Sequence, residues 1–372
     1  MTLQQQTLGD RVLRVMASLQ LTVIGLLILL VLTIWGTLYQ VEHGLYEAQE
    51  RFYMSWIFLA GGWLPLPGAQ LVMVVLFLNL TASFLHLAGI GRLSWGFTLT
   101  HGGLVLMLLA GAVTFLFGER SQLTLAEGEA SNQSVLNRRV QLASWRVMPG
   151  ESLGPPQTID LAAIRPAMPL SLSGIQIQVE EVYIHSTRSE TDPSGTLEPL
   201  PMAKTGSANR PGLRLSCSTT DGTSQAVILH ITDTQPVELK EADASIFLVL
   251  RRTPTPLPAE IRLIDFEKDV YPGSPMARNF SSRVSLTDGE LEREIVISMN
   301  KPLRYRGFTF YQSSFQILPD GRMASTFAVV KNYGRLMPYV ATFMTAFGML
   351  IHFAGHLILH LRKPSSARGQ LV

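Results

Sequence analysis

The sequence contains a single cysteine, Cys217, among its 372 residues. One thiol excludes an intramolecular disulfide, a CxxC redox motif and a zinc site made of several cysteines. Charge is also scarce, because Asp, Glu, Lys and Arg make up 16% of the residues while hydrophobic residues make up 47%. This balance is too apolar for an ordinary soluble protein. The net charge of +2 comes without a basic stripe, so no nucleic-acid partner is expected.

Charged residues are absent from long apolar runs at residues 15–39, 71–90, 98–117 and 337–361. Each run is long enough for a helix to cross a hydrocarbon core of roughly 30 Å. A helix is expected because lipid offers no partners for backbone polar groups. The sequence therefore predicts a membrane protein with four transmembrane α-helices in a lipid bilayer. The first run is interpreted as an uncleaved anchor, because Trp35–Gln40 is not a small-residue cleavage site.

Basic residues indicate how these helices are oriented. If the helices alternate in direction, the basic residues on one side of the membrane are Arg11, Arg14, Arg92, Arg362, Lys363 and Arg368. The positive-inside rule makes that side cytoplasmic, together with both chain termini. We therefore expect a multi-pass protein of the bacterial cytoplasmic (inner) membrane.

The apolar runs divide the chain into three parts. Residues 1–117 hold three helices and an external loop, 40–70, whose segment Glu47–Phe58 is amphipathic and aromatic and is predicted to lie in the membrane interface. Residues 118–336 are expected to form an extracytoplasmic, periplasmic domain between the third and fourth helices. Residues 337–372 hold the fourth helix and a basic cytoplasmic tail.

The extracytoplasmic domain has the pattern of a mainly-β fold. Alternating residues in Ser173–Ile184 and a β-branched run in Glu294–Ser298 predict strands. Asp288-Gly289 predicts a hairpin connection, and the Pro-rich stretch 253–258 is interpreted as a turn or loop. The polar stretch 186–211 is predicted to be a mobile loop. Together these signals favour an antiparallel β-sandwich or a curved sheet.

The segment 298–315 is the most informative part of the chain, and it is expected to form a strand, a turn and a second strand. Its ordered pattern is Asn300, Lys301, Pro302, Leu303, Tyr305, Gly307, Phe310, Tyr311, Gln312 and Ser313. This pattern resembles the ResB family, also called CcsB. A plain hairpin would explain the same residue types, with Pro302 at a strand edge, Gly307 in the turn and Tyr305 packed on a face. The alternative is that the hairpin docks the domain onto the membrane helices near a haem or cytochrome site.

The resemblance extends to Asp265-Phe266, Tyr271-Pro272, Phe280–Ser282 and Ala17–Leu19. It implies a subunit of the machinery that attaches haem to apocytochrome c, which works with a CcsA/ResC-like membrane partner and depends indirectly on thiol-reducing proteins. The tryptophan-rich haem-handling segment of that machinery belongs to the partner and is absent here. The resemblance thus implies a subunit that is not catalytic alone and that carries haem b only transiently.

Histidines inside spans are rare and mark functional sites. Those within or at the ends of the helices are His86, His101, His352, His356 and His360, and all fall in the predicted cytoplasmic half of the bilayer. Neutral imidazole is a common axial ligand of haem iron. The resemblance implies that a transmembrane histidine ligates haem together with one from the partner, and His101 lies at the matching place.

Each histidine also has a plainer interpretation. Gly102 and Gly103 beside His101 would let either a flat macrocycle or a neighbouring helix approach closely. His352, His356 and His86 are further candidates for haem contact, and each could instead bond to a neighbouring helix or another subunit. Asn79 is expected to form a hydrogen bond between helices rather than to act as a ligand.

Two other functions remain open at this point. A quinol-linked haem b subunit for electron transfer would carry histidine pairs on both sides of the bundle, whereas these histidines crowd one leaflet. A structural scaffold would hold the β domain at the membrane without haem. Replacement of His101 by Ala distinguishes these functions, because loss of bound haem would exclude a scaffold without haem.

Overall fold

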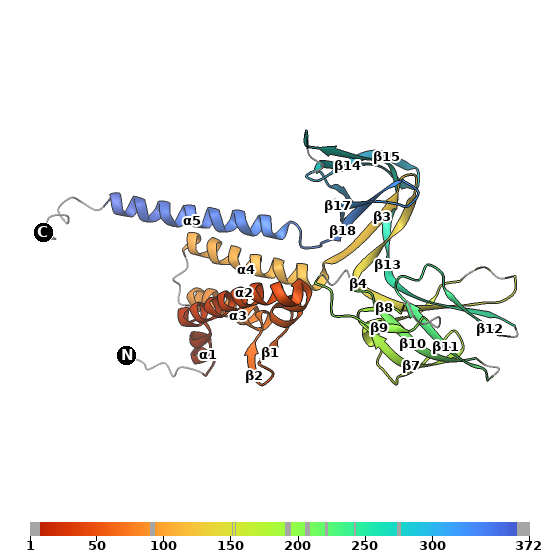
Figure 1. Ribbon diagram of the computed structural model, residues 1–372. Helices are drawn as coiled ribbons and strands as arrows, with labels where there is room; N and C mark the ends of the chain where they lie inside the picture. Colours follow the sequence, from red (N-terminus) through yellow and green to blue (C-terminus); the bar gives the residue numbers. More distant parts are fainter. Residues whose placement is uncertain are drawn as a thin grey trace. The chain divides into compact units, whose positions relative to one another are not determined.

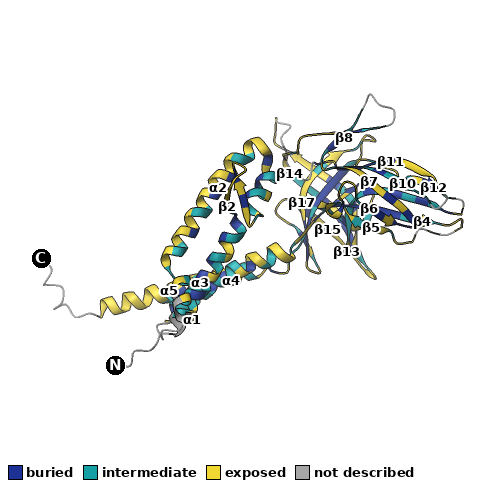
Figure 2. Cartoon of the chain, turned by 90° about the horizontal axis from the view of Figure 1, so that it is seen from below, coloured by how far each residue is buried: buried dark blue, intermediate teal, exposed yellow. Residues whose placement is uncertain are grey.

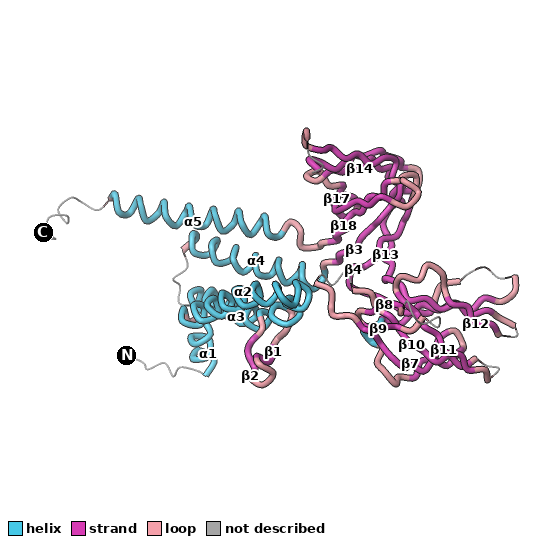
Figure 3. Tube along the Cα trace, viewed as in Figure 1, coloured by secondary structure: helices cyan, strands magenta, loops and turns pink. Residues whose placement is uncertain are grey.

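The computed structural model describes residues 8–89, 94–150, 152, 154–189, 195–204, 209–219, 222–241, 243–273 and 277–362. The chain divides into two compact units, one formed by Met1–Gly118 with Asn332–Val372 and the other by Glu119–Lys331. We call the first the helical unit and the second the β domain. Among the described residues, the α-helices lie in the first unit, and the strands lie in the second apart from one short hairpin (Figures 1 and 3).

The helical unit consists of α1 (Leu8–Met16), α2 (Leu19–Ala48), α3 (Ala69–Gly89), α4 (Trp95–Phe117) and α5 (Met337–Leu361). Among the described residues, four helices are long and apolar enough to cross a membrane, namely α2 with its continuation to Tyr53, α3, α4 and α5. Much of their surface is exposed (Figure 2), which fits side chains that face lipid. Of the basic residues used for orientation, Arg92, Lys363 and Arg368 lie outside the described residues.

The first predicted helix, 15–39, was wrong at its start, because α2 begins at Leu19. The chain breaks between α1 and α2, and the Ser18 hydroxyl caps α2 by accepting a hydrogen bond from Leu21 N at 3.2 Å. At the other end α2 runs to Ala48, but Gly44 has non-helical φ and ψ angles of 86° and 161°, so the helix is kinked a few residues after its predicted end. Hydropathy therefore located the membrane-length stretch but not the helix boundaries.

The external loop 40–70 is also more regular than predicted. A π-helical turn, Gln49–Tyr53, follows α2, and then strands β1 (Ile57–Ala60) and β2 (Leu64–Pro67) form an antiparallel hairpin. Phe58 and Leu66 of this hairpin pack with Leu32 and Phe52 in the core of the helical unit. The segment folds onto α2 instead of forming an irregular loop.

Asn79 holds the break between α1 and α2. Its side chain is 2% exposed, and its amide donates to the carbonyl oxygens of Met16 at 2.5 Å and Ser18 at 3.0 Å. The Thr22 hydroxyl donates to the Oδ1 atom of Asn79 at 2.6 Å. The Ser83 hydroxyl donates to the carbonyl oxygen of Ala17 at 3.2 Å. These bonds satisfy carbonyl groups that a helix end leaves open, which matters most in an apolar bundle. The predicted role of Asn79 between helices is confirmed.

The β domain contains the remaining strands. They are β3 (Glu119–Ala126), β4 (Ala130–Val147), β5 (Gln157–Asp160), β6 (Pro169–Leu172), β7 (Ile175–Tyr183), β8 (Ser186–Arg188), β9 (Leu197–Pro199), β10 (Gly212–Ser218), β11 (Ser224–His230), β12 (Val237–Lys240), β13 (Ser245–Val270), β14 (Ala277–Asp288), β15 (Leu291–Ser298), β16 (Leu303–Tyr305), β17 (Phe308–Ile317) and β18 (Met323–Lys331). In the described chain, one sheet has the order β11-β10-β7-β6 and a larger one the order β15-β14-β13-β4-β3-β18-β17-β16.

Two hydrophobic cores organise these sheets into two lobes. In the first lobe, the sheet β11-β10-β7-β6 packs on β4, β12 and the first half of β13 as a sandwich, with Ile177 and Leu248 fully buried. In the second lobe, the larger sheet curves around Ile261, Phe310 and Phe327. The sequence left a sandwich and a curved sheet as alternatives, and the domain contains one of each. Cys217 lies buried in the first core.

The Pro-rich stretch 253–258 is not a turn, and this prediction was wrong. It lies inside the long strand β13, which continues from one lobe into the other. Pro254 and Pro256 pair with Val135 and Gln133 of β4, and the ladder shifts register on both sides of this short stretch. Proline is tolerated there because the bulges already interrupt the backbone hydrogen bonds that it cannot donate.

The predicted mobile loop 186–211 is structured in its described parts, while residues 190–194 and 205–208 lie outside the described residues. Strands β8 and β9 pair, and Ser186 is fully buried. Arg188 binds both carboxylate oxygens of Asp233 at 2.8 and 2.9 Å. This bidentate pair fastens the segment to the loop that follows β11.

Candidate functional site

The segment that carries the family resemblance closes the curved sheet of the second lobe. Ser298 at the end of β15 and Lys301 exchange backbone hydrogen bonds of 3.2 and 3.1 Å. Pro302 then leads into β16, where Leu303 is 6% exposed and packs in the second core. The corner at Asn300 therefore turns the chain from β15 into β16.

The turn between β16 and β17 explains Tyr305 and Gly307. Tyr305 pairs with Phe308, so Arg306 and Gly307 form a two-residue turn with φ angles of 41° and 85°. Two successive positive φ angles are typical of a type I′ hairpin, and glycine accepts such a φ without strain. The Tyr305 hydroxyl donates to Asp288 at 2.6 Å, and this bond raises the pKa of Tyr305.

Gln312 bridges strands inside the same lobe. Its Oε1 accepts from the Ser282 hydroxyl at 2.7 Å, and its Nε2 donates to the Ser325 hydroxyl at 2.9 Å. Both serines are fully buried, and their hydroxyl oxygens lie 2.9 Å apart, within hydrogen-bond distance of each other. The register of β17 shifts between Gln312 and Ser314, which marks a bulge at this point. Ser282 and Ser325 were not predicted as partners, because their strands are far apart in sequence.

The hairpin interpretation therefore explains Tyr305, Gly307 and Gln312. The hairpin does not explain Asn300, Lys301 and Tyr311 in the same way, because their side chains are exposed. Tyr311 is 40% exposed. Fold alone gives no reason for these three residue types. Together with Ser313, which is also exposed, they are the members of the pattern that remain candidates for contact with a partner.

Phe266 and Phe280, which also belong to the family resemblance, form an aromatic cluster with Phe315. The rings of Phe266 and Phe280 lie 5.2 and 5.1 Å from that of Phe315, centroid to centroid. The Lys268 ammonium lies 5.2 Å from the Phe315 ring. Phe315 comes from β17 beyond the bulge at Gln312, so the bulge helps to aim it at the two strands β13 and β14.

His101 lies in α4 and is half-buried. Its Nδ1 is 3.1 Å from the Phe97 carbonyl oxygen, and its ring stacks on the Phe97 ring at 3.7 Å. Because a carbonyl oxygen only accepts, this contact assigns a proton to Nδ1, and in the neutral ring that tautomer leaves the lone pair on Nε2. This is the arrangement in which a histidine is oriented to ligate a metal. In that tautomer Nε2 would be the atom that donates to a metal ion such as haem iron.

The glycines beside His101 serve helix packing. A Cβ on Gly103 would lie 2.8 Å from Thr345 N and 2.9 Å from Ala341 O, both in α5. On the opposite helix, a Cβ on Gly348 would lie 2.5 Å from Thr100 N. Of the two alternatives that the sequence left for Gly103, the neighbouring helix is the one that occupies the space.

The other candidate histidines do not join His101 in one cluster. His352 and His356 are exposed, and their rings lie 4.6 Å apart. His86 is half-buried in α3. Within the described residues, no group of three or more His, Cys, Asp or Glu side chains could hold a metal ion.

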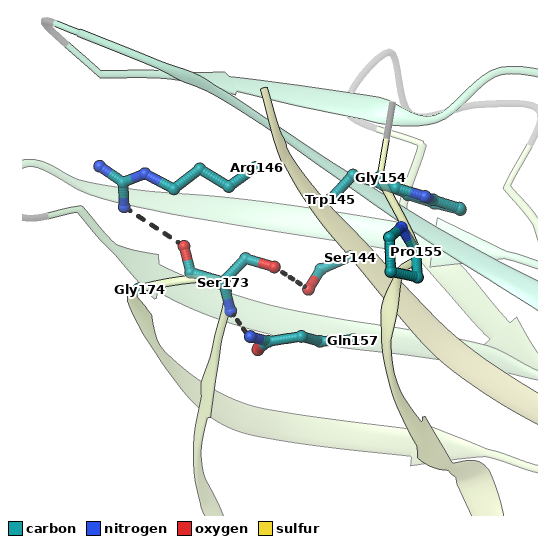
Figure 4. A pocket seen from close by; sticks show the side chains of 8 residues that line it. All are labelled: Ser144, Trp145, Arg146, Gly154, Pro155, Gln157, Ser173 and Gly174. Carbon is teal, nitrogen blue, oxygen red and sulfur yellow. Dashed lines mark hydrogen bonds between the residues drawn. The ribbon is translucent and has the colours of Figure 1, made fainter. Parts of the chain in front are cut away.

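A polar cavity of about 290 Å³ lies in the first lobe of the β domain. Figure 4 shows Ser144, Arg146 and Gln157 converging on Ser173. Ser173 bonds the Ser144 hydroxyl at 2.6 Å, and Arg146 also pairs with Glu241 at 2.8 Å. Since these groups satisfy one another around the β6–β7 turn, we interpret the cavity as turn packing.

Among the described residues, the fold combines four helices that are long and apolar enough to cross a membrane with a two-lobed β domain inserted between the third and fourth of them. The family model of the ResB-like family matches residues 237–355, from β12 through most of α5. This match confirms the resemblance over residues 237–355. It supports a role in cytochrome c biogenesis. No curated protein is significantly similar to the chain.

Proposed function

We propose that this chain is the ResB-like subunit of the machinery that attaches haem to apocytochrome c. The observation that carries the proposal is the ResB-like match over 237–355. That region includes the corner at Asn300, the bridge at Gln312 and, in α5, His352. The proposed role is to help carry haem across the bacterial inner membrane and to present it to apocytochrome c.

His101 is the proposed haem ligand of this chain. Its protonated Nδ1 is engaged by Phe97, which orients the ring and leaves Nε2 as the donor atom. Bound haem b would supply the vinyl groups that react with the cytochrome thiols. The second ligand is proposed to come from a CcsA/ResC-like partner, as the resemblance to the ResB-like family implies.

The β domain is proposed to act outside the membrane. The positive-inside pattern supports cytoplasmic termini and a periplasmic β domain. The exposed residues Asn300, Lys301 and Tyr311 form the proposed contact with the partner or with apocytochrome c. Closure of the curved sheet holds them in place, since the bonds at Lys301 and Gln312 fix both ends of this segment. The chain is proposed to position haem and partner rather than to catalyse thioether formation alone.

A visible spectrum tests the role of His101. The chain is purified with its CcsA/ResC-like partner as wild type, His101→Ala and His43→Ala. His43 is a matched control, because its Nδ1 also lies 3.3 Å from the carbonyl oxygen four residues earlier. Reduced haem b bands that fade only in His101→Ala are expected. Equal bands in all three samples contradict the ligand assignment, and no haem in any sample favours a scaffold without haem.

A further inference from the structure

The helical unit contains an apolar groove between α2 and the β1–β2 hairpin. Its volume is about 390 Å³. Six side chains of α2, from Ile24 to Trp35, line one wall, and Leu66 and Pro67 of β2 line the other. Ile24, Leu27 and Val31 are more than half exposed, so the groove opens to the surroundings of a membrane-length helix.

The groove is suited to hydrocarbon and not to a polar ligand. Every side chain that lines it is aliphatic, aromatic or proline. Pro65 and Pro67 also remove two backbone N–H groups from β2. An unpaired N–H group facing lipid costs several kcal/mol, so their absence lowers the cost of placing this strand beside an acyl chain.

A cation lies beyond the Trp35 end of the groove. The rings of Trp35 and Phe52 are 5.5 Å apart, and the Arg51 guanidinium lies 5.9 Å from the Phe52 ring and 5.2 Å from the Tyr39 ring. Arg51 donates to the Tyr39 hydroxyl at 3.2 Å and to the Leu59 carbonyl at 2.9 Å.

Both of these acceptors are uncharged. In the described part of the chain, no carboxylate lies within ion-pair distance of Arg51. Glu47 bonds to the Tyr39 hydroxyl instead. The charge of this half-buried guanidinium is therefore not neutralised by a direct ion pair.

We propose that the groove binds an acyl chain of an anionic phospholipid whose headgroup pairs with Arg51. An apolar channel with a cation beyond one end complements an amphiphile with a hydrocarbon tail and a negative head. A helix of a partner protein is about 10 Å across, so it would need two wide walls to pack against. Here one wall is the short stretch Leu66–Pro67. This inference does not depend on the proposed function.

Native mass spectrometry of the full chain tests the proposal. The protein is reconstituted in equal parts phosphatidylglycerol and phosphatidylethanolamine, extracted in mild detergent, and its retained lipids are counted. The wild type is expected to retain phosphatidylglycerol preferentially. Arg51→Gln should lower the ratio of the two lipids about threefold to fivefold, the effect of one ion pair near a surface. Arg51→Lys, which keeps the charge, should preserve the preference even if the bond to Leu59 is lost.

Two further variants complete the test. Val31→Trp fills the groove and is expected to reduce total retained lipid while circular dichroism stays that of the wild type. Arg120→Gln removes an exposed charge in β3 and should change neither value. The proposal is overturned if the wild type retains no lipid, if Arg51→Gln keeps the wild-type ratio, or if folded Val31→Trp retains as much lipid as the wild type.

Discussion

Asp288 and Arg306 tie together two turns of the β domain. The Arg306 guanidinium lies 2.7 Å from Asp288 Oδ2, the same oxygen that accepts the Tyr305 hydroxyl at 2.6 Å. Asp288 ends β14 before its hairpin with β15, whereas Arg306 sits in the turn between β16 and β17. Arg306 is largely exposed, so the ion pair itself contributes little stability. Its effect is to fix the position of the segment that carries the ResB-like pattern.

Replacing Gln312 by Leu should destabilise the β domain. The change removes two hydrogen bonds to the buried hydroxyls of Ser282 and Ser325, which keep only their 2.9 Å bond to each other, and each lost bond costs about 0.5–1.5 kcal/mol. Gln316→Leu is the control, because Gln316 is exposed in the same strand. Thermal unfolding of the full chain in detergent should show a lower Tm for Gln312→Leu alone. Equal Tm values for both variants would contradict the bridging role.

Replacing Gly103 by Ala should separate α4 from α5. The added methyl group would lie 2.3 Å from Thr345 Oγ1 and within 3 Å of the α5 backbone, so the helices must move apart. Gly111→Ala in the same helix meets no atom within 4 Å and serves as the control. Unfolding in detergent should show lower stability for Gly103→Ala only. A Gly103→Ala protein as stable as Gly111→Ala would show that the close approach is not needed.

The β domain should lose stability at acid pH through His185. Burial, reinforced by Arg210 and His230, lowers the pKa of His185 below its usual 6.5. Its Nδ1 accepts the Arg210 N–H at 2.9 Å, which only the neutral ring can do. A lowered folded-state pKa gives stability that is present above pH 6.5 and lost as the pH falls through the folded pKa.

Tm measured from about pH 7.5 down to about pH 5 checks this expectation. His185→Asn keeps an acceptor for Arg210 but cannot titrate, so its Tm should fall less steeply with acid than that of the wild type. Identical pH profiles for the two proteins would contradict the assignment to His185.

Some of this architecture could be predicted because it depends on local pattern. Membrane-length apolar runs located the spanning helices, and Asp288-Gly289 identified a hairpin. Helix ends were less predictable, since the break between α1 and α2 at Ser18 lies inside an apolar run and α2 is kinked at Gly44. The prolines at 254 and 256 were misleading because the interrupted ladder between β4 and β13, which makes them acceptable in a strand, is a tertiary feature.

Some residues of the candidate site could likewise be identified from the sequence, and others only from the structure. His101 was identified from its residue type and its place in an apolar run, and Asn79 from its polarity inside a span. The partners of Gln312 were not predictable, because Ser282 and Ser325 come from strands that only the folded sheet brings together. Gly103 could be assigned to helix packing only after α5 was in place.

The proposed function is tested most directly by haem attachment to a reporter apocytochrome c. A bacterium without its own attachment machinery would express the reporter with the CcsA/ResC-like partner, with or without this chain. Covalent haem, detected by its peroxidase activity on a denaturing gel, is expected only when both membrane proteins are present. It should fall strongly with His101→Ala and not with His43→Ala. The same amount of haem-bearing reporter with the partner alone would contradict a role for this chain in the attachment machinery.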